Sequence, residues 1–447
     1  MSTWRRPAWA TICALQPRLH PGFTGQSIVF AIGFYLVTLI MAPQLWLGPL
    51  VNLPTDFIAI PLLFITVVLS GRLAQLLRFS IHDGLFLLFV IWMAAGAVLS
   101  NLTPESTAHL VNYFKWFILF KLVVALLPDP RAARRMMGFI VFLVTVLAVE
   151  VMFHRFSPDG RGWAGQTFSW IDPEVLAAGG KGRARWVGIF DGPGVFAVLF
   201  SIALPFLIIK LGRGYTGATR LFALLLTALY MVAIYFIGSR GGLLATAATL
   251  GIFIALKSGV SIKHLVMFGS VVALLFSAAP SHLTTVRDSS NSTQYRVEMW
   301  AQGLDMVKQD PAFGIGRGNF RAYTSKLIAH NSAVEIGGEM GMVGLFIWFG
   351  MIYFAIKSLV LAWRRTEDPK ERDFYVAMIL SILGYLISAM FVTLEYETWY
   401  LLLAVCAAVG RYQPEPVRAE KRDLMFIGGG VVGFLVMMQV FVIFYLG

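Results

Sequence analysis

Arginine, histidine, amide and carboxylate side chains gather in one polar stretch, residues 280–344, of an otherwise apolar sequence. Arg296 lies early in this stretch, His330 comes near its end, and Glu335 and Glu339 follow where apolar sequence resumes. Guanidinium groups bind phosphate and carboxylate anions bidentately, and a neutral imidazole can take a proton from a hydroxyl group. These residue types predict a site for an anionic, lipid-linked substrate where a loop meets a membrane.

The sequence around His330 predicts the beginning of a helix. Ser332-Ala-Val-Glu335 fits a capping box, in which two polar side chains satisfy free N–H groups of the first turn. His330 and Asn331 then lie at the positive end of the helix dipole, which favours a bound anion and disfavours protonation of the imidazole. A single histidine in a loop is usually a solvated residue. Beside a helix end, arginines and an acid, His330 is better interpreted as a general base, with Asn331 and Glu335 supporting it.

Cations also precede two apolar segments elsewhere in the chain. Arg185 ends a Gly- and Arg-rich stretch, 154–186, together with Lys181 and Arg183, and Arg240 lies in a tight Gly-Ser-Arg-Gly-Gly turn. Lys181 and Arg183 also fit a second interpretation, in which they snorkel to lipid phosphates. Arg240 fits that interpretation less well, because the turn holds it where helices converge and charge inside a membrane is usually functional.

The polar stretch also contains a helical pattern and a glycine-rich turn. Trp300, Leu304 and Val307 share one face of a helix, which either lies on the membrane surface or packs on neighbouring spans. Pro311 ends this helix. Residues 314–318 (Gly-Ile-Gly-Arg-Gly) are similar to a phosphate-binding loop, but no strand precedes them and no Gly-Lys-Ser/Thr follows. They therefore predict a reversal of the chain rather than a nucleotide site.

The composition is that of a membrane protein. Of the 447 residues, 58% are hydrophobic and 13% are charged, whereas soluble domains carry about 25% charged residues. Apolar runs of about 20 residues recur, each long enough to cross the hydrocarbon layer as a helix. The formal net charge of +12 reflects the orientation of loops across a membrane, and nucleic acid is not an expected partner. Cys13 and Cys406 are too far apart in the sequence to indicate a disulfide or metal framework.

We expect an all-α polytopic membrane protein with about 12–13 transmembrane helices. Loops rich in Arg and Lys alternate with loops poor in cations, and the positive loops should be cytoplasmic. This alternation places the large loop 280–336 outside the cytoplasm. We also expect an N-terminal bundle (1–180), a catalytic region (181–365) and C-terminal helices (366–447). The predicted spans lie near 26–43, 51–70, 80–99, 110–127, 136–153, 187–209, 221–238, 241–256, 262–279, 337–361, 374–393, 398–410 and 424–446.

Five short motifs follow one another along residues 180–365. They are Arg185-Trp-Val-Gly188-Ile-Phe190-Asp-Gly-Pro193, Gly238-Ser-Arg240-Gly, Arg296-Val-Glu-Met-Trp300, Pro311-Ala-Phe-Gly-Ile-Gly316, and His330-Asn331 followed by Gly337-Gly-Glu339-Met-Gly341-Met-Val-Gly344. In this order they resemble the O-antigen ligase and polymerase family of bacterial inner membranes. Each motif alone is weak, but five in order within many spans are fairly specific. Gly194 departs from the pattern, since many relatives have Asn after the proline.

The resemblance implies a glycosyltransferase with a GT-C-like membrane fold that acts on the periplasmic face of the bacterial inner membrane. The donor would be an undecaprenyl-diphosphate-linked glycan, transferred with inversion and without a metal ion or other cofactor to an acceptor hydroxyl. Arg185, Arg240 and Arg296 would bind the diphosphate in place of a divalent ion, for which no Asp-rich cluster is available. His330 would take the proton of the acceptor, and Glu339 would orient His330 or substitute for it.

Three acceptors fit this chemistry: lipid A core, a growing polysaccharide in a polymerase, and a Ser or Thr hydroxyl in a protein O-oligosaccharyltransferase. A different class, a polysaccharide or lipid transporter, would show inverted repeats with helices broken at matching depths. The sequence has no such symmetry, and a large polar loop with His and Arg favours an enzyme. Membrane lipids are the expected surroundings of either class.

Overall fold

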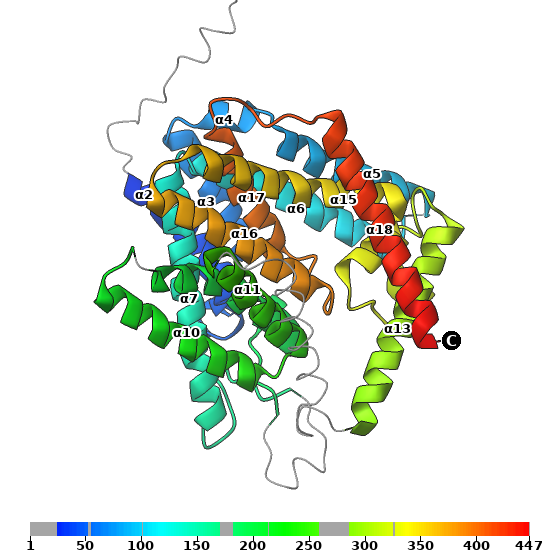
Figure 1. Ribbon diagram of the computed structural model, residues 1–447, viewed down its shortest axis with the longest axis horizontal. Helices are drawn as coiled ribbons and strands as arrows, with labels where there is room; N and C mark the ends of the chain where they lie inside the picture. Colours follow the sequence, from blue (N-terminus) through cyan, green and yellow to red (C-terminus); the bar gives the residue numbers. More distant parts are fainter. Residues whose placement is uncertain are drawn as a thin grey trace, which may run out of the picture.

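The computed structural model describes residues 25–51, 55–100, 102–169, 182–212, 214–258, 286–324 and 327–446. Within these ranges the regular elements are helices, and one isolated antiparallel bridge joins Arg161 and Thr167. The predicted all-α fold is confirmed. The α-helices (Figure 1) are α2 (Gly25–Ile40), α3 (Thr55–Leu69), α4 (Leu73–Leu77), α5 (Ile81–Leu99), α6 (Pro104–Leu126), α7 (Pro130–Phe156), α9 (Pro193–Ile208), α10 (Gly217–Ile237), α11 (Arg240–Ser258), α13 (Val286–Gln309), α14 (Phe320–Tyr323), α15 (Ser332–Arg365), α16 (Pro369–Ala389), α17 (Glu397–Arg411) and α18 (Lys421–Leu446).

Eight of the described helices are long and apolar enough to cross a membrane, and three shorter apolar helices accompany them. The chain is therefore a multi-pass membrane protein. Each predicted span except 262–279, which lies outside the described residues, coincides with a helix. The largest hydrophobic core includes Tyr35, Phe196 and Val405, one from each of the three predicted sections, so the sections share one core.

Several helices begin at a short polar side chain followed by proline. Thr103, Asp129 and Asp368 cap α6, α7 and α16 by accepting a backbone N–H of the first turn, and a proline follows each of them. Proline costs nothing at this position, because its missing N–H would have no partner inside the helix. Such polar first turns explain why α6 and α7 begin before the apolar spans predicted from hydropathy.

Helix α17 forms the centre of the bundle. Its residues from Thr398 to Gly410 are all buried, and it packs on α6, α15, α7 and α5 (Figure 1). A helix that is apolar on every face is expected to be surrounded by protein. The short run predicted at 398–410 is thus a central packing element of the fold.

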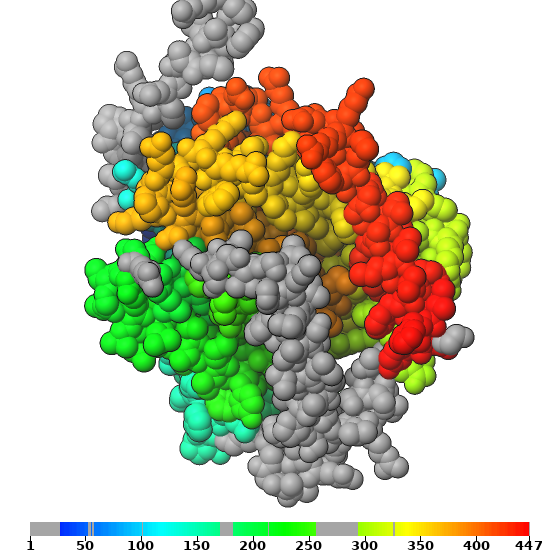
Figure 2. All heavy atoms as spheres, in the orientation of Figure 1, coloured from blue at the N-terminus to red at the C-terminus, as the bar shows by residue number. Residues whose placement is uncertain are grey.

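Helix α18 lies on the outside of the molecule. It runs as a ridge along the face shown in Figure 2, and it contacts α13 and α15. Its outward side carries exposed apolar side chains, among them Val432, Val436, Val440 and Phe444. A soluble protein rarely exposes so continuous an apolar surface, and this surface fits contact with lipid chains.

Helix α15 is interrupted at Gly341, where φ is 68° and ψ is −173°. The loop between α13 and α15 pairs with the backbone on both sides of this break. The N–H of Gly316 donates to the carbonyl of Glu339 at 2.9 Å, and the carbonyl of Pro311 accepts the N–H of Met342 at 2.8 Å. Backbone groups freed inside a membrane need such partners, so the loop and the broken helix stabilise each other.

The chain reversal predicted at residues 314–318 is confirmed. Gly314, Gly316 and Gly318 have φ of 66°, 86° and 93°, values in the left-handed region that favour glycine. Glycine is required at position 314 for a second reason, because a Cβ there would lie 2.5 Å from the carbonyl carbon of Glu339. The glycines therefore allow the loop to approach α15 closely.

Helix α13 packs on α15 and α18. Val297, Leu304 and Met306 are buried in a second, smaller core that also includes residues of α18. The ring of Trp300 contacts that of Phe441 on α18 at a tilt. Of the two interpretations open for the helical pattern at 300–307, packing on neighbouring spans is the one observed.

Candidate active site

His330 and Asn331 lie at the beginning of α15, as the sequence predicted, but the capping residue differs. The side chain of Asn331 accepts the N–H groups of Ala333 and Val334 at 3.1 and 3.2 Å. The predicted capping box of Ser332 and Glu335 is wrong. Asn331 itself has the extended backbone of a cap, with φ −153° and ψ 112°. The first helical residue is therefore Ser332, and the cap lies one position earlier than predicted.

Ser332 and Glu335 instead hold the chain that connects α16 to α17. The hydroxyl of Ser332 accepts the N–H of Leu394 at 2.9 Å, and the hydroxyl of Thr393 donates to Glu335 at 2.7 Å. Both side chains are buried. They therefore position the loop 390–396 beside the start of α15.

His330 is held in a left-handed conformation, with φ of 50°. The indole N–H of Trp300 donates to the carbonyl of Ala329 at 2.8 Å and fixes the preceding residue. Burial, Arg296 and Arg321 together lower the pKa of His330 to about 4. The expected direction is confirmed, and burial is the largest cause, followed by the two arginines. At neutral pH the imidazole is therefore unprotonated and able to accept a proton.

Three arginines from separate elements lie near one another, and we call Arg183, Arg240 and Arg296 the arginine cluster. Burial, Arg240 and Arg183 lower the pKa of Arg296, and burial and Arg240 lower that of Arg183. The side chain of Arg183 packs against Gly238, where a Cβ would lie 3.1 Å from its Cγ. Neighbouring like charges repel one another, so a bound anion would stabilise the arrangement.

Arg185 has hydrogen-bond partners of its own. Its Nη1 donates to Asp191 and its Nε to the carbonyl of Thr167, both at 2.9 Å. In an extended segment, side chains two positions apart share a face. Residues 182–186 contain no turn, and their side chains alternate between buried and less buried. Arg183 and Arg185 therefore share a face of the segment and differ in their partners. Of the three arginines predicted to act together, the structure brings together Arg240 and Arg296, and Arg183 joins them. Lys181 lies outside the described residues.

The segment that carries Arg183 is fixed by a buried carboxylate of α7. Gln166 donates to Glu150 at 2.6 Å, and Ser169 N–H donates to the carbonyl of Arg183 at 3.0 Å. On the other side, Ala184 N–H donates to the carbonyl of Phe236 at 3.0 Å. The segment is thus tied to α7 and α10, which gives Arg183 a defined position.

Glu339 holds the loop that precedes α15. One of its carboxylate oxygens pairs with Arg317, and the other accepts the N–H of Phe320 at 2.8 Å. Glu339 and Arg317 each expose 2% of their side-chain surface. Both oxygens of Glu339 therefore bind the segment 317–320, and its predicted role of orienting or replacing His330 stays a prediction.

Arg317 is the centre of a buried polar network that the sequence analysis missed. It lies 3.6 Å from a carboxylate oxygen of Glu335, and its Nη2 donates to the hydroxyl of Tyr113 at 3.2 Å. Burial lowers the pKa of Arg317, but Tyr113 and the neighbouring carboxylates outweigh this and raise it above its ordinary value. The sequence did contain a signal for this network. Glu335 and Glu339 lie one turn apart in an apolar helix, and two such carboxylates require a cation close by.

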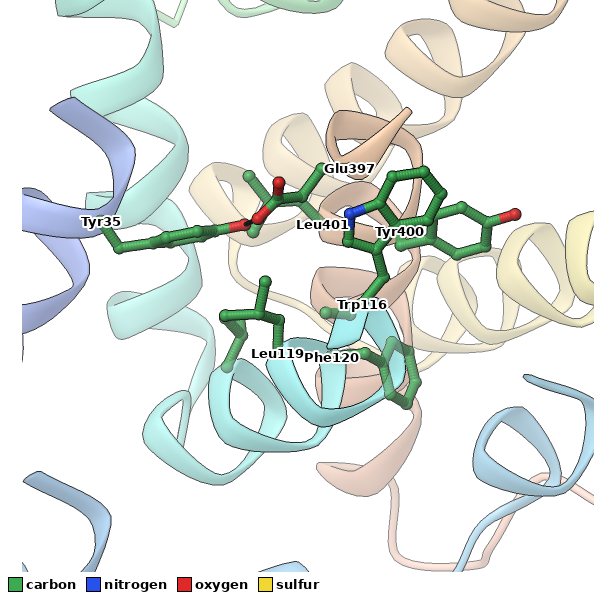
Figure 3. A pocket seen from close by; sticks show the side chains of 9 residues that line it. Tyr35, Trp116, Leu119, Phe120, Glu397, Tyr400 and Leu401 are labelled. Atoms are coloured by element: carbon green, nitrogen blue, oxygen red, sulfur yellow. Dashed lines mark hydrogen bonds between the residues drawn. The ribbon is translucent and has the colours of Figure 1, made fainter. Parts of the chain in front are cut away.

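The one hollow described in the bundle lies away from the predicted site residues. A narrow hollow between α2, α6 and α17 is lined by Tyr35, Trp116 and Glu397 among others, and none of the predicted site residues lines it (Figure 3). Tyr35 donates to Glu397 there at 2.7 Å.

In the described ranges no three His, Cys, Asp or Glu side chains are close enough to hold a metal ion.

Comparisons with known proteins agree with the resemblance noted in the sequence. Residues 222–349 match the family model described as O-antigen ligase. The chain is also 21% identical over 371 residues to the teichuronic acid biosynthesis protein TuaE of Bacillus subtilis (strain 168), and this alignment covers 75% of the chain and 74% of that protein. The matched family segment contains Arg240, Arg296, Arg317 and His330, so it includes most of the candidate active site.

Proposed function

We propose, starting from the O-antigen ligase match of residues 222–349, that this membrane protein transfers a glycan from an undecaprenyl-diphosphate-linked donor to an acceptor hydroxyl. The reaction takes place on the periplasmic face of the bacterial inner membrane. The observation that carries the proposal is the arginine cluster beside an unprotonated His330.

The arginine cluster binds the diphosphate of the donor. Guanidinium groups form bidentate hydrogen bonds with phosphate oxygens, and they stabilise the negative charge that grows on the leaving group. Arg183 lies in the segment before α9, Arg240 begins α11 and Arg296 lies on α13, so three separate parts of the chain contribute to this binding. Arg185, bonded to Asp191 and to the carbonyl of Thr167, positions the segment that carries Arg183.

His330 is the general base. The acceptor oxygen attacks the anomeric carbon of the glycan while its proton passes to the imidazole. The bond between that carbon and the phosphate oxygen breaks, and the electron pair leaves with the lipid diphosphate. Asn331 holds His330 at the start of α15, and Glu335 and Glu339 support the surrounding loops.

A polymerase is the second candidate within this class. It would use the same donor chemistry and take the end of a growing polysaccharide as its acceptor. The similarity to a protein named for teichuronic acid biosynthesis favours a polysaccharide product. Lipid A core and a protein hydroxyl are the other acceptors that the same site would serve.

The test is glycan transfer by the purified protein in liposomes that contain an undecaprenyl-diphosphate-linked glycan. A lipid A core, a polysaccharide fragment and a peptide with Ser and Thr are offered as separate acceptors. We expect one of them to become glycosylated while undecaprenyl diphosphate is released, and we expect His330→Ala to stop both events. Arg418→Ala, a change in an exposed side chain, is the matched control and should be as active as the wild type. Donor that crosses the bilayer and is never cleaved would show a transporter instead.

A further inference from the structure

Two arginines that belong to different elements act on His330, and Phe320 and Ala329, the residues next to Arg321 and His330, pack in one small core. Arg296 on α13 and Arg321 on α14 both act electrostatically on its imidazole. Arg296 also interacts with Arg240 and Arg183 in the arginine cluster. Arg321 therefore brings a cation to His330 in addition to those proposed to bind the donor.

The short helix that carries Arg321 is held firmly. Phe320, the residue before it, is 1% exposed and donates its N–H to Glu339 at 2.8 Å. Asn319 accepts the hydroxyl of Thr103 on α6, also at 2.8 Å. Arg321 itself is exposed, so a fixed backbone presents an exposed cation at the surface of the site.

Three elements converge around Arg321. His109 on α6 and Tyr396 before α17 lie within its electrostatic range, in addition to His330. Gly318 touches His109, where a Cβ would lie 2.7 Å from the Cδ2 of the imidazole. The loop that carries Arg321 is therefore packed against α6 at the same point.

Arg321 differs from its neighbour Arg317 in its partners. Arg317 is buried and paired with Glu339 and Glu335. Among the residues that the structure describes, no carboxylate forms an ion pair with Arg321. An exposed arginine beside an unprotonated base, with no such carboxylate, is suited to bind an anionic group of a ligand.

The reaction geometry assigns this anionic group to the acceptor. In an inverting displacement the attacking hydroxyl and the leaving diphosphate lie on opposite sides of the anomeric carbon. The arginine cluster accounts for the leaving side, and His330 must be near the attacking hydroxyl. We propose that Arg321, with His109 and Tyr396 beside it, binds a phosphate or carboxylate group that the acceptor carries close to the hydroxyl that becomes glycosylated.

This inference rests on the proposed function, and its test compares acceptors that differ in one group. Lipid-anchored acceptor sugars are prepared with a phosphate, with a carboxylate, or with a hydroxyl in place of either. For the anionic acceptors, Arg321→Ala should raise the acceptor KM by roughly 10- to 100-fold, the usual effect of losing a charge-assisted hydrogen bond. The acceptor KM for the neutral sugar and the donor KM should change little. Arg321→Lys should recover part of the loss, since it keeps the charge without the fork.

The other outcomes separate this inference from the proposed function. An equal loss for anionic and neutral acceptors would make Arg321 a structural residue, and a raised donor KM would assign it to the donor diphosphate; either result would overturn the inference. Unchanged kinetics with every acceptor would also overturn it. Absence of transfer by the wild-type protein with any acceptor would instead contradict the proposed function. Thermal unfolding of Arg321→Ala, measured beside the wild type, shows whether the variant is folded.

Discussion

Arg317 and Glu339 form an ion pair in which each side chain exposes only 2% of its surface. The second carboxylate oxygen of Glu339 accepts the N–H of Phe320 at 2.8 Å. One carboxylate of α15 therefore holds both ends of the segment 317–320, which leads directly to Arg321. This relationship makes the loop part of the helix bundle, and it gives Glu339 a structural role.

Glu339→Ala should destabilise the protein by about 3–5 kcal/mol, because it leaves the buried guanidinium of Arg317 without its main partner. Glu339→Gln keeps an acceptor for the N–H of Phe320 and should cost less. Thermal unfolding in detergent measures both effects, with the exposed Glu415→Ala as the control. If Glu339→Ala unfolded like the wild type but had lost transfer, Glu339 would be acting in the reaction.

His330→Ala should lower the turnover number by about 100- to 10,000-fold, the usual contribution of a positioned general base. Binding of the donor should fall much less, because the arginine cluster holds the diphosphate independently. Single-turnover transfer and donor binding are measured on the same preparation. A variant that binds the donor poorly yet transfers at the wild-type rate when saturated would make His330 a substrate ligand.

The pH dependence of transfer should reflect the lowered pKa of His330. Burial, Arg296 and Arg321 lower this pKa from 6.5 to about 4, so the base stays unprotonated as the pH falls below 6.5. In the free enzyme, kcat/KM should decline only as the pH approaches about 4.

Arg321→Ala removes one of the cations that lower this pKa, so its decline in kcat/KM should begin at a higher pH than in the wild type. Arg418→Ala should leave the profile unchanged. A wild-type profile that already declines around 6.5, the ordinary value for histidine, would contradict the assigned surroundings of His330.

Arg183→Ala should raise the donor KM by roughly 10- to 100-fold, through loss of charge-assisted hydrogen bonds to the diphosphate. Arg183→Lys should recover only part of this, since lysine lacks the planar fork. Arg185→Ala should have a smaller effect on the donor KM, because Arg185 is bonded to Asp191 and Thr167. A larger effect for Arg185 than for Arg183 would return Arg185 to the diphosphate site.

Transfer should persist in excess EDTA, because arginines are proposed to hold the diphosphate without a divalent ion. The measurement compares initial rates with and without the chelator at constant ionic strength. Loss of activity that added Mg²⁺ or Mn²⁺ restores would show that the arginine cluster acts together with a metal ion.

The sequence predicted the class of fold because a lipid bilayer allows few kinds of backbone structure to cross it. Long apolar runs must be helices in lipid, and their number and order follow from hydropathy. Helix ends were less well predicted, since the caps at Thr103 and Asp129 add polar turns that hydropathy ignores. The register of the cap at Asn331 depended on the backbone of a single residue, which the pattern of polar side chains does not determine.

The site was predicted in part. His330, Arg240 and Arg296 were found because charged and polar residues are conspicuous beside apolar sequence. Arg183 was assigned a weaker role than Arg185, since only tertiary hydrogen bonds decide which of two nearby arginines reaches the cluster. Arg321 looked like one loop cation among several, and its importance follows from the elements that converge on it.

Helix α17 is short for a helix that must be inserted into a membrane. Its 15 residues rise about 22 Å at 1.5 Å per residue, less than the ~30 Å hydrocarbon layer. Charged residues lie at both its ends, Glu397 and Arg411. Such a segment gains little from contact with lipid alone, whereas in the finished protein α5, α6, α7 and α15 enclose it. During synthesis the helices made before α17 must therefore leave a place for it, so that its insertion completes the interior of the protein while α18 is still to follow.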